Sequence, residues 1–175
     1  RRFGSEPAGV GAGAALEELP AGADPEIVRS LADRLLGAKR PLLITAYAGR
    51  NPAACALIEE LARFAGIRVI EHNPIYLNIA HDSPCFSGHM PGNHVAETDF
   101  GMLVDVDVPW IPNFTPENPA TFWAHIDVDV VKQAFPMWGF ANNLRIAGDS
   151  CRILAQLLQE LKTRAPPAFR AAGAQ

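Results

Sequence analysis

The sequence contains no run of about 18 uncharged apolar residues, so it predicts no membrane-spanning helix. Arg1 and Arg2 open the chain, but no apolar stretch follows them, which argues against a secretory signal. Cysteine is scarce, since Cys55, Cys85 and Cys151 are widely spaced, odd in number and free of any CxxC motif. This pattern predicts neither a disulfide framework nor a zinc ribbon, and it fits a cytoplasmic protein in a reducing compartment.

A strong charge of either sign is also missing. The chain carries 15 Lys and Arg against 19 Asp and Glu, a formal net charge of -4. Such a charge gives no field that would attract nucleic acid or an anionic membrane surface. With 175 residues, 49% of them hydrophobic, the chain can bury one sizeable core but is too short for the several domains of most cofactor enzymes. We therefore expect one globular domain.

The familiar catalytic and nucleotide-binding motifs are absent as well. The sequence has no G-x-G-x-x-G, no P-loop, no nucleophile elbow and no H-E-x-x-H segment. His81, His89 and His94 share one loop, but their spacing matches no zinc pattern, and loop histidines are more often surface or interface residues. We therefore predict no catalytic residue and no metal ligand in this chain, and a free-standing enzyme is not favoured.

What the sequence does contain is an alternation of amphipathic helices with short apolar runs. Asp24-Pro25 and Asn51-Pro52 each predict a helix start, because Asp or Asn can cap free amides and Pro fits the first turn. Gly148-Asp149 leads into a third helix. The apolar runs of strand length cover residues 41–46, 67–70, 100–106, 122–128 and 144–147. The alternation predicts an α/β fold: a three-layer, doubly wound parallel sheet with helices on both faces.

The composition divides the chain into three parts. Residues 1–23 are rich in Gly and Ala and read as a linker, residues 24–163 as the α/β domain, and residues 164–175 as a disordered tail. Two long proline-rich loops, residues 71–92 and 108–119, lie inside the domain. Loops of this length in a compact domain are usually functional or contact another domain or subunit.

Polar residues follow the predicted strands at the edge where ligands bind in open parallel sheets. Ala48-Gly49 could let a phosphate approach the backbone, or could be a plain strand-to-helix turn. Two Asp-x-Asp segments, Asp105-Val-Asp107 and Asp127-Val-Asp129, could accept ribose hydroxyls or hold a divalent ion, or could serve as caps and solvated groups. The aromatic side chains that could stack on a flat ring, but for which we favour an interface role, are Trp110, Phe114, Trp123 and Trp138.

The order of several segments is that of a known enzyme family. The segments are Lys39-Arg-Pro-Leu-Leu-Ile44, Phe64-Ala-Gly-Ile-Arg-Val69, Asn78-Ile-Ala-His-Asp-Ser-Pro84 followed by Gly88, Asp99-Phe-Gly-Met-Leu-Val104, His125-Ile-Asp-Val128 and Leu144-Arg-Ile-Ala-Gly-Asp149. In order and spacing, over roughly residues 24–162, they resemble the central domain of acetolactate synthase-like enzymes, which depend on thiamine diphosphate. No single motif carries this resemblance.

The resemblance implies a Rossmann-like sheet of about six parallel strands, of the DHS/FAD-binding type, between two thiamine-binding domains of a parent chain. The family's activating glutamate and its metal-binding Gly-Asp-Gly…Asn motif belong to those domains and are not found in this sequence. Thiamine diphosphate and magnesium would therefore bind outside this chain, which alone would not be catalytic. The parent would be a transferase or lyase that decarboxylates a 2-oxo acid, working as a dimer or tetramer.

In acetolactate synthases proper, the corresponding domain binds FAD, and the resemblance carries its contacts onto this sequence. The diphosphate would face Ala46, Tyr47, Ala48 and Gly49, the adenosine side Asp127 and Val128, the sugar hydroxyls Gly148 and Asp149, and the flavin chain Gly88 and His89. Two departures argue against the transfer. Asp105 stands where flavin-binding members place a Gly-Ala-Arg segment, so an anion replaces a cation. The glycine turn is also reduced to Gly49 beside the bulky Tyr47.

Three functions therefore stay open after the sequence. The favoured one is a structural central domain, without FAD, of a thiamine-diphosphate-dependent decarboxylase or carboligase. The second is a stand-alone module that binds FAD or another nucleotide. The third is a scaffold whose aromatic and proline-rich loops pack on other domains or a second subunit.

Overall fold

The computed structural model describes residues 22–132, 140, 142–166 and 169. Almost all of the predicted linker, most of the predicted tail and Trp138 lie outside these residues. The domain boundaries therefore remain predictions. Residues Gly22 and Ala23 lead directly into the first helix, where Gln156 bonds to the backbone N–H and C=O of Ala23 at 2.9 and 3.2 Å.

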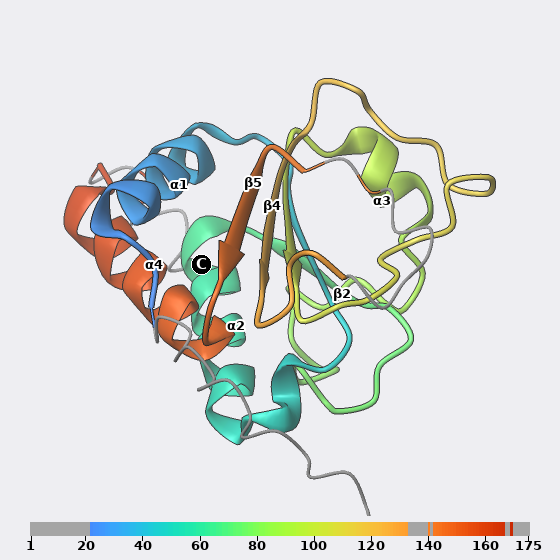
Figure 1. Ribbon diagram of the computed structural model, residues 1–175, viewed down its shortest axis with the longest axis horizontal. Coiled ribbons are helices and arrows are strands. Elements are labelled where there is room, and N and C mark those ends of the chain that lie inside the picture. The colour runs from blue at the N-terminus through green and yellow to red at the C-terminus, as the bar shows by residue number, and fades with distance from the viewer. Residues whose placement is uncertain (1–21, 133–139, 141, 167–168, 170–175) are drawn as a thin grey trace, which may run out of the picture.

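A single sheet of parallel strands forms the middle of the molecule (Figure 1). Its strands are β1 (Pro41–Thr45), β2 (Arg68–Glu71), β3 (Phe100–Val104), β4 (Phe122–Asp127) and β5 (Leu144–Ala147), in the order β2-β1-β3-β4-β5. Each neighbouring pair is parallel. The five apolar runs are confirmed as the strands, and the sheet has five strands in the described residues where the family resemblance implies about six.

The helices begin and end where the sequence predicts. They are α1 (Pro25–Gly37), α2 (Pro52–Ala65), the short α3 (Gly92–Glu97) and α4 (Ser150–Arg164), with a 3-10 turn η1 at Ala48–Arg50. Asp24, Asn51 and Asp149 cap α1, α2 and α4 through their side chains, and Gly66 ends α2 at φ 66°. Among the α-helices, only α3, which begins where the expected loop 71–92 ends, was not predicted. Each helix in the described part of the chain is too short or too polar to cross a bilayer.

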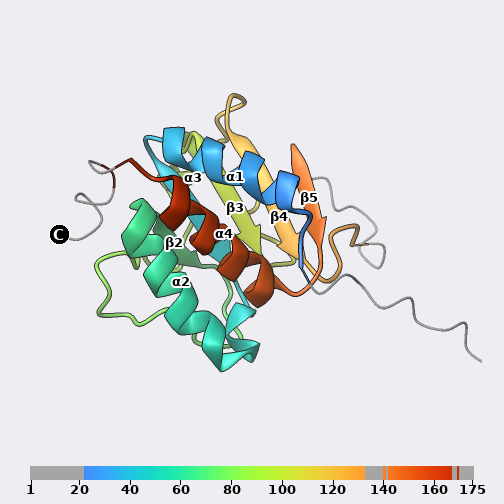
Figure 2. The ribbon, with the colours of Figure 1, turned by 90° about the vertical axis from the view of Figure 1, so that its left-hand side faces the viewer.

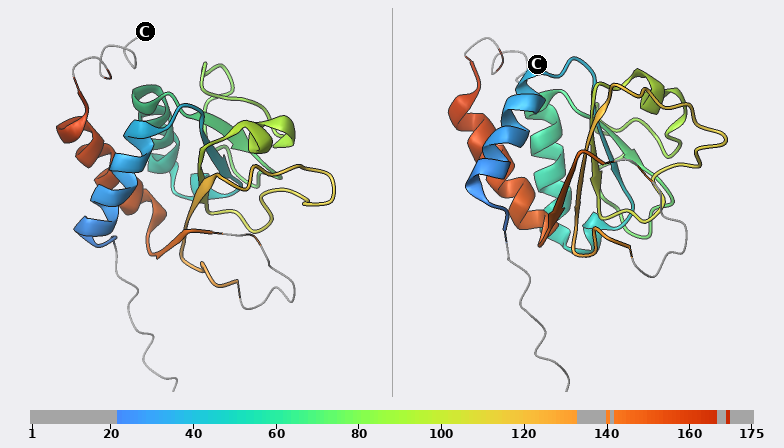
Figure 3. Two further views of the ribbon diagram at one scale, coloured as in Figure 1. Left: turned by 90° about the horizontal axis from the view of Figure 1, so that it is seen from above. Right: turned by 45° about the horizontal axis from the view of Figure 1, so that its top comes forward.

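The sheet separates two apolar cores of unequal size. α1, α2 and α4 cover one face, where α1 and α4 lie side by side, while α3 and the long loops cover the other (Figures 2 and 3). Alternate strand residues supply the two cores: Leu43 and Met102 face the three long helices, whereas Leu42 and Leu103 face α3 and the loops. The prediction of helices on both faces is therefore confirmed, with loops doing much of the covering on the second face.

Two of the aromatic residues expected at an interface belong to this second core. Trp110 and Trp123 are 1% and 4% exposed, and their ring centroids lie 4.9 Å apart. Trp110 also donates its indole N–H to Glu117 at 2.8 Å. The interface expectation is wrong for these two residues, because the loop after β3 folds back and buries them within the chain. Phe114, by contrast, is 83% exposed.

The second core leaves no room for a side chain at Gly101 in β3. A Cβ atom there would lie 2.0 Å from the ring of Trp123, the residue beside it in the register of β3 and β4. We predict that Gly101→Ala lowers the free energy of unfolding by about 2 kcal/mol, because the overlap displaces a packed ring. Urea unfolding followed by tryptophan fluorescence measures the change.

Gly37 at the end of α1 offers the matched control. It is exposed and a Cβ there would meet nothing within 4 Å. Gly37→Ala should leave stability unchanged or raise it by up to about 1 kcal/mol, since Ala is the better helix former. Equal effects of the two substitutions would contradict this account of the core.

Candidate functional site

The buried ammonium of Lys132 joins the carboxyl ends of three neighbouring strands. Its Nζ donates to Asp127 Oδ2 at 2.7 Å, to Asp107 Oδ1 at 2.9 Å and to Tyr47 Oη at 3.1 Å. The Tyr47 hydroxyl in turn donates to Asp107 Oδ1 at 2.6 Å. Tyr47 follows β1, Asp107 lies beyond β3 and Asp127 ends β4, so one cation links loops that are far apart in the sequence.

Asp105, the other predicted carboxylate of the third loop, points into the protein. It is fully buried at φ 46°, where its side chain accepts hydrogen bonds from Arg50 at 3.0 Å and from the Ser150 hydroxyl. Its backbone carbonyl accepts from the N–H groups of Ala46 and Tyr47 at 3.2 and 3.1 Å. Asp105 therefore fixes the ends of β1 and β3 and the start of α4, and its charge is met by Arg50.

The pKa values of these groups follow from their burial and their partners. Burial raises the pKa of Asp105, although the hydrogen bond from Ser150 and the positive charge of Arg50 oppose the rise. Burial and the hydrogen bond to Asp107 raise the pKa of Tyr47 far above its ordinary value. Tyr47 therefore stays a neutral phenol that can donate a hydrogen bond, while Asp127 stays an anion.

The glycine turn predicted to face a diphosphate is filled by the chain itself. A Cβ atom at Gly49 would lie 1.9 Å from the carbonyl oxygen of Leu77, so the close approach allowed by this glycine is to its own loop. The Gly49 N–H donates to Asn78 Oδ1 at 2.9 Å, and Asn78 Nδ2 donates to the Ala46 carbonyl at 3.2 Å. Ala48 is buried in the core beneath α2.

The remaining predicted residues divide between two pockets at this edge of the sheet. Ala46, Tyr47 and Asp107 line one of them, beside residues 72–75. Val128, Gly148 and Asp149 line the other, together with Arg50, Asn51, Ser150, Cys151 and Arg152. The structure therefore brings Val128 together with the predicted sugar residues Gly148 and Asp149, whereas Asp127 accepts a hydrogen bond from the Tyr47 hydroxyl at 3.3 Å.

Asp149 occupies the amino terminus of α4 in the second pocket. Its side chain accepts a hydrogen bond from the Arg152 N–H at 2.9 Å. The free amides of a helix start are the groups that would bind a phosphate. In this chain a carboxylate already takes one of them and adds a negative charge at the same place.

Gly88 and His89 lie elsewhere, against β2 at the edge of the sheet. The Gly88 carbonyl accepts from the Glu71 N–H at 3.1 Å, and His89 Nδ1 lies 3.1 Å from the Glu71 carbonyl oxygen. Glu71 is 1% exposed, and its Oε2 lies 2.7 Å from His81 Nε2. Glu71, His81 and His89 are the residues of the described chain whose donor atoms gather closely enough to hold a metal ion.

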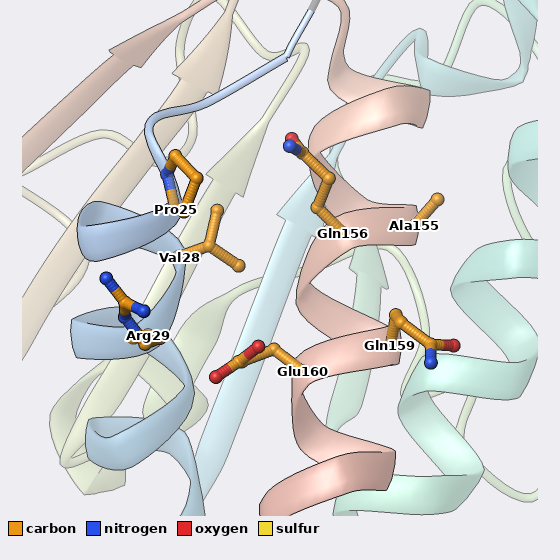
Figure 4. Close-up of a pocket in the computed structure, with 7 residues that line it drawn as sticks. All are labelled: Pro25, Val28, Arg29, Ala155, Gln156, Gln159 and Glu160. Atoms are coloured by element: carbon orange, nitrogen blue, oxygen red, sulfur yellow. The ribbon is translucent and has the colours of Figure 1, made fainter.

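A further hollow lies between α1 and α4, away from all the predicted site residues (Figure 4). Val28 of α1 and Gln156 of α4 line it. Gln156 uses both ends of its amide to bind the backbone of Ala23. This hollow is a seam between two packed helices, and its polar groups hold the start of α1.

Three residues central to these networks were missed from the sequence: Lys132, Asn78 and Glu71. Lys132 follows Asp127-Val-Asp129 closely, and a lone lysine in an otherwise apolar segment after an acidic pair was the available signal. Asn78 and Glu71 gave no comparable signal, because the hydrogen bonds that join them, and those from Asn78 to Gly49 and Ala46, depend on how the loop after β2 folds.

No protein-family model matches the sequence, and no curated protein matches it. Solved structures do match. An enzyme from Mycobacterium smegmatis described as thiamin diphosphate-dependent aligns with a TM-score of 0.65 and 22% identity over 89% of this chain. Benzoylformate decarboxylase from Polynucleobacter necessarius aligns with a TM-score of 0.60 and 18% identity over 90% of this chain.

A third similar structure is a thiamine diphosphate-dependent 4-hydroxybenzoylformate decarboxylase from Rhodococcus jostii RHA1, with a TM-score of 0.64 and 16% identity over 85% of this chain. The chain spans less than a third of each of these proteins, 32%, 30% and 29% of their lengths. At these identities the likeness shows the fold. The sheet and helices found here are thus similar in fold to one part of each of these longer proteins.

The Lys132 network makes a prediction about acid stability. Burial raises the pKa of Asp127, but the His125 ring, whose Nε2 lies 3.8 Å from Asp127 Oδ2, and the hydrogen bond from Lys132 outweigh it and bring the pKa down to about 2. A carboxyl with a lowered pKa adds stability that is complete above its unfolded pKa of 3.8 and is lost as the pH falls towards 2. This contribution is about 2 kcal/mol. We predict that Lys132→Met raises the Asp127 pKa and costs about 3 kcal/mol at neutral pH.

Carbon-detected NMR titration of Asp127, with urea unfolding between pH 2 and 7, measures both effects. Lys162→Met is the matched control, because Lys162 pairs with Glu60 while 42% exposed. It should change stability by less than about 0.5 kcal/mol. An Asp127 pKa that is the same in Lys132→Met and in the unsubstituted chain would refute the central role of this ammonium.

Proposed function

We propose that this chain is the central, structural domain of a thiamine-diphosphate-dependent enzyme that decarboxylates a 2-oxo acid. The observation that carries the proposal is the parallel five-stranded sheet, which aligns over 85 to 90% of the chain with enzymes of which it spans less than a third. The order of sequence segments supports an acetolactate synthase-like carboligase within this class. Thiamine diphosphate and magnesium belong, in this proposal, to flanking domains of a longer chain that works as an oligomer.

The interactions of the described residues favour a structural role for this domain over a catalytic one. Charged groups at the carboxyl edge of the sheet form ion pairs with one another. Lys132 pairs with both Asp107 and Asp127, and Arg50 pairs with Asp105. Groups held in this way fix the loop positions on which neighbouring domains would rest. They also leave Tyr47 neutral and hydrogen-bonded instead of available as a base.

The test uses the complete open reading frame that contains this chain. We expect its product to release CO2 from pyruvate or benzoylformate only when thiamine diphosphate and Mg²⁺ are both supplied. Formation of acetolactate from pyruvate would support the carboligase within the class, and release of an aldehyde alone would support a plain decarboxylase. An open reading frame without a Gly-Asp-Gly…Asn segment downstream of this chain would end the proposal.

We further propose that the domain carries no FAD. Two groups placed to bind a diphosphate, the Gly49 N–H and the Arg152 N–H at the start of α4, are engaged by Asn78 and Asp149. The space beside Gly49 is occupied by the Leu77 backbone. A flavin nucleotide could enter only if residues 73–78 left the turn, and this would break the hydrogen bonds of the buried Asn78.

Titration of the 175-residue chain with FAD and, separately, with ADP tests this second point. We expect no quenching of FAD fluorescence and no heat up to about millimolar ligand, a concentration at which even binding of about 4 kcal/mol would be detected. Stoichiometric FAD binding would contradict the proposal. Binding of ADP that is lost in Arg152→Ala would instead favour a stand-alone nucleotide module at the pocket of Arg50 and Arg152.

A further inference from the structure

We infer that Glu71, His81 and His89 form a binding site for a zinc ion at the edge of the sheet. One carboxylate oxygen and one ring nitrogen from each histidine lie within 4.8 Å of one another. The site lies at the end of β2, on a different set of loops from the Lys132 network, and it does not depend on the proposed function. The sequence predicted no metal ligand here, because the histidine spacing matches no zinc pattern and the contact of His81 and His89 with Glu71 depends on the fold.

Glu71 supplies a carboxylate that is already oriented by hydrogen bonds. Its Oε1 accepts hydrogen bonds from the Asn78 N–H at 2.6 Å, from Asn78 Nδ2 at 3.2 Å and from the Ile79 N–H at 3.3 Å. Its Oε2 faces His81 at 2.7 Å and His89 at 3.9 Å. One oxygen is thus fixed by the protein while the other is directed at the two histidines.

Aromatic contacts with Phe86 and with each other hold the two imidazole rings in place. The His81 ring stacks on Phe86 with centroids 4.4 Å apart and planes 16° apart, and the His89 ring meets the edge of both. Residues 85–88 run beside β2 through backbone hydrogen bonds between Val69 and residues 85 and 87, and between Glu71 and Gly88. This backbone pairing brings His89 to the end of β2, next to the Glu71 carboxylate.

The donor set and its exposure favour zinc over the hard cations. Two imidazoles and one carboxylate are typical ligands of Zn²⁺, whereas Mg²⁺ and Ca²⁺ prefer oxygen ligands throughout. His81 and His89 are 50% and 49% exposed in their side chains, so an ion can reach the site and keep a water as its fourth ligand. Zinc would lie between Glu71 Oε2 and His81 Nε2, and the His89 ring would turn from the Glu71 carbonyl, now 3.1 Å from its Nδ1, to offer a ring nitrogen.

Isothermal titration of the metal-free 175-residue chain with zinc sulfate tests the site. We expect one zinc per chain, with affinity at least about tenfold weaker in Glu71→Gln and in His89→Gln. Zinc should also raise the melting temperature of the unsubstituted chain by several degrees, and should not do so in either variant. Magnesium chloride should give neither heat nor a shift.

His94→Gln and Cys85→Ser are the matched controls, since both residues lie in the same part of the chain and outside the cluster. They should bind zinc as tightly as the unsubstituted chain. Because Glu71 is buried and its substitution can unfold the protein, His89→Gln on a half-exposed ring keeps the test decisive. Zinc affinity unchanged in His89→Gln, or no zinc binding up to about 100 µM in the unsubstituted chain, would overturn the inference.

Discussion

Every residue of β1 and β3 is buried, and this constraint decides where polar chemistry can occur in the molecule. A strand covered on both faces has no place for a charged side chain along its length. In β1 and β3 ionisable groups are therefore absent from the strand itself and lie in the loops beyond its ends. In this chain the loops carry carboxylates, and each buried carboxylate needs a cation or several N–H donors to offset the loss of water.

The cations and N–H donors that offset the burial of these carboxylates belong to the chain itself. Lys132 serves two aspartates at once, Arg50 serves Asp105, and Asn78 donates to Glu71 while accepting from the Gly49 turn. The Asn78 contact also takes up the Gly49 N–H, and the Leu77 backbone fills the space beside Gly49. Loops whose charged groups are paired within the chain are held in fixed positions. This agrees with the structural role proposed for the domain.

On the second face of the sheet, too, burial of side chains holds the loops in place. Trp110 and Trp123 fill a core that short α3 alone could not cover, and Gly101 leaves the room that the Trp123 ring requires. At the outer edge, the segment after β2 returns beside that strand and places His89 against Glu71. Long loops in this domain thus act as covering layers, and the polar groups they carry become preorganised.

Local features of the fold were fixed by the sequence because their causes are local. Asp24, Asn51 and Asp149 each cap a helix through an amide two or three residues away, and apolar runs of four to six residues can only be buried strands here. The partners of Lys132 are different, since Tyr47 lies 85 residues earlier in the chain. Which carboxylate meets which cation, and whether Gly49 faces a ligand or its own loop, depends on how distant loops pack, and only the tertiary structure decides it.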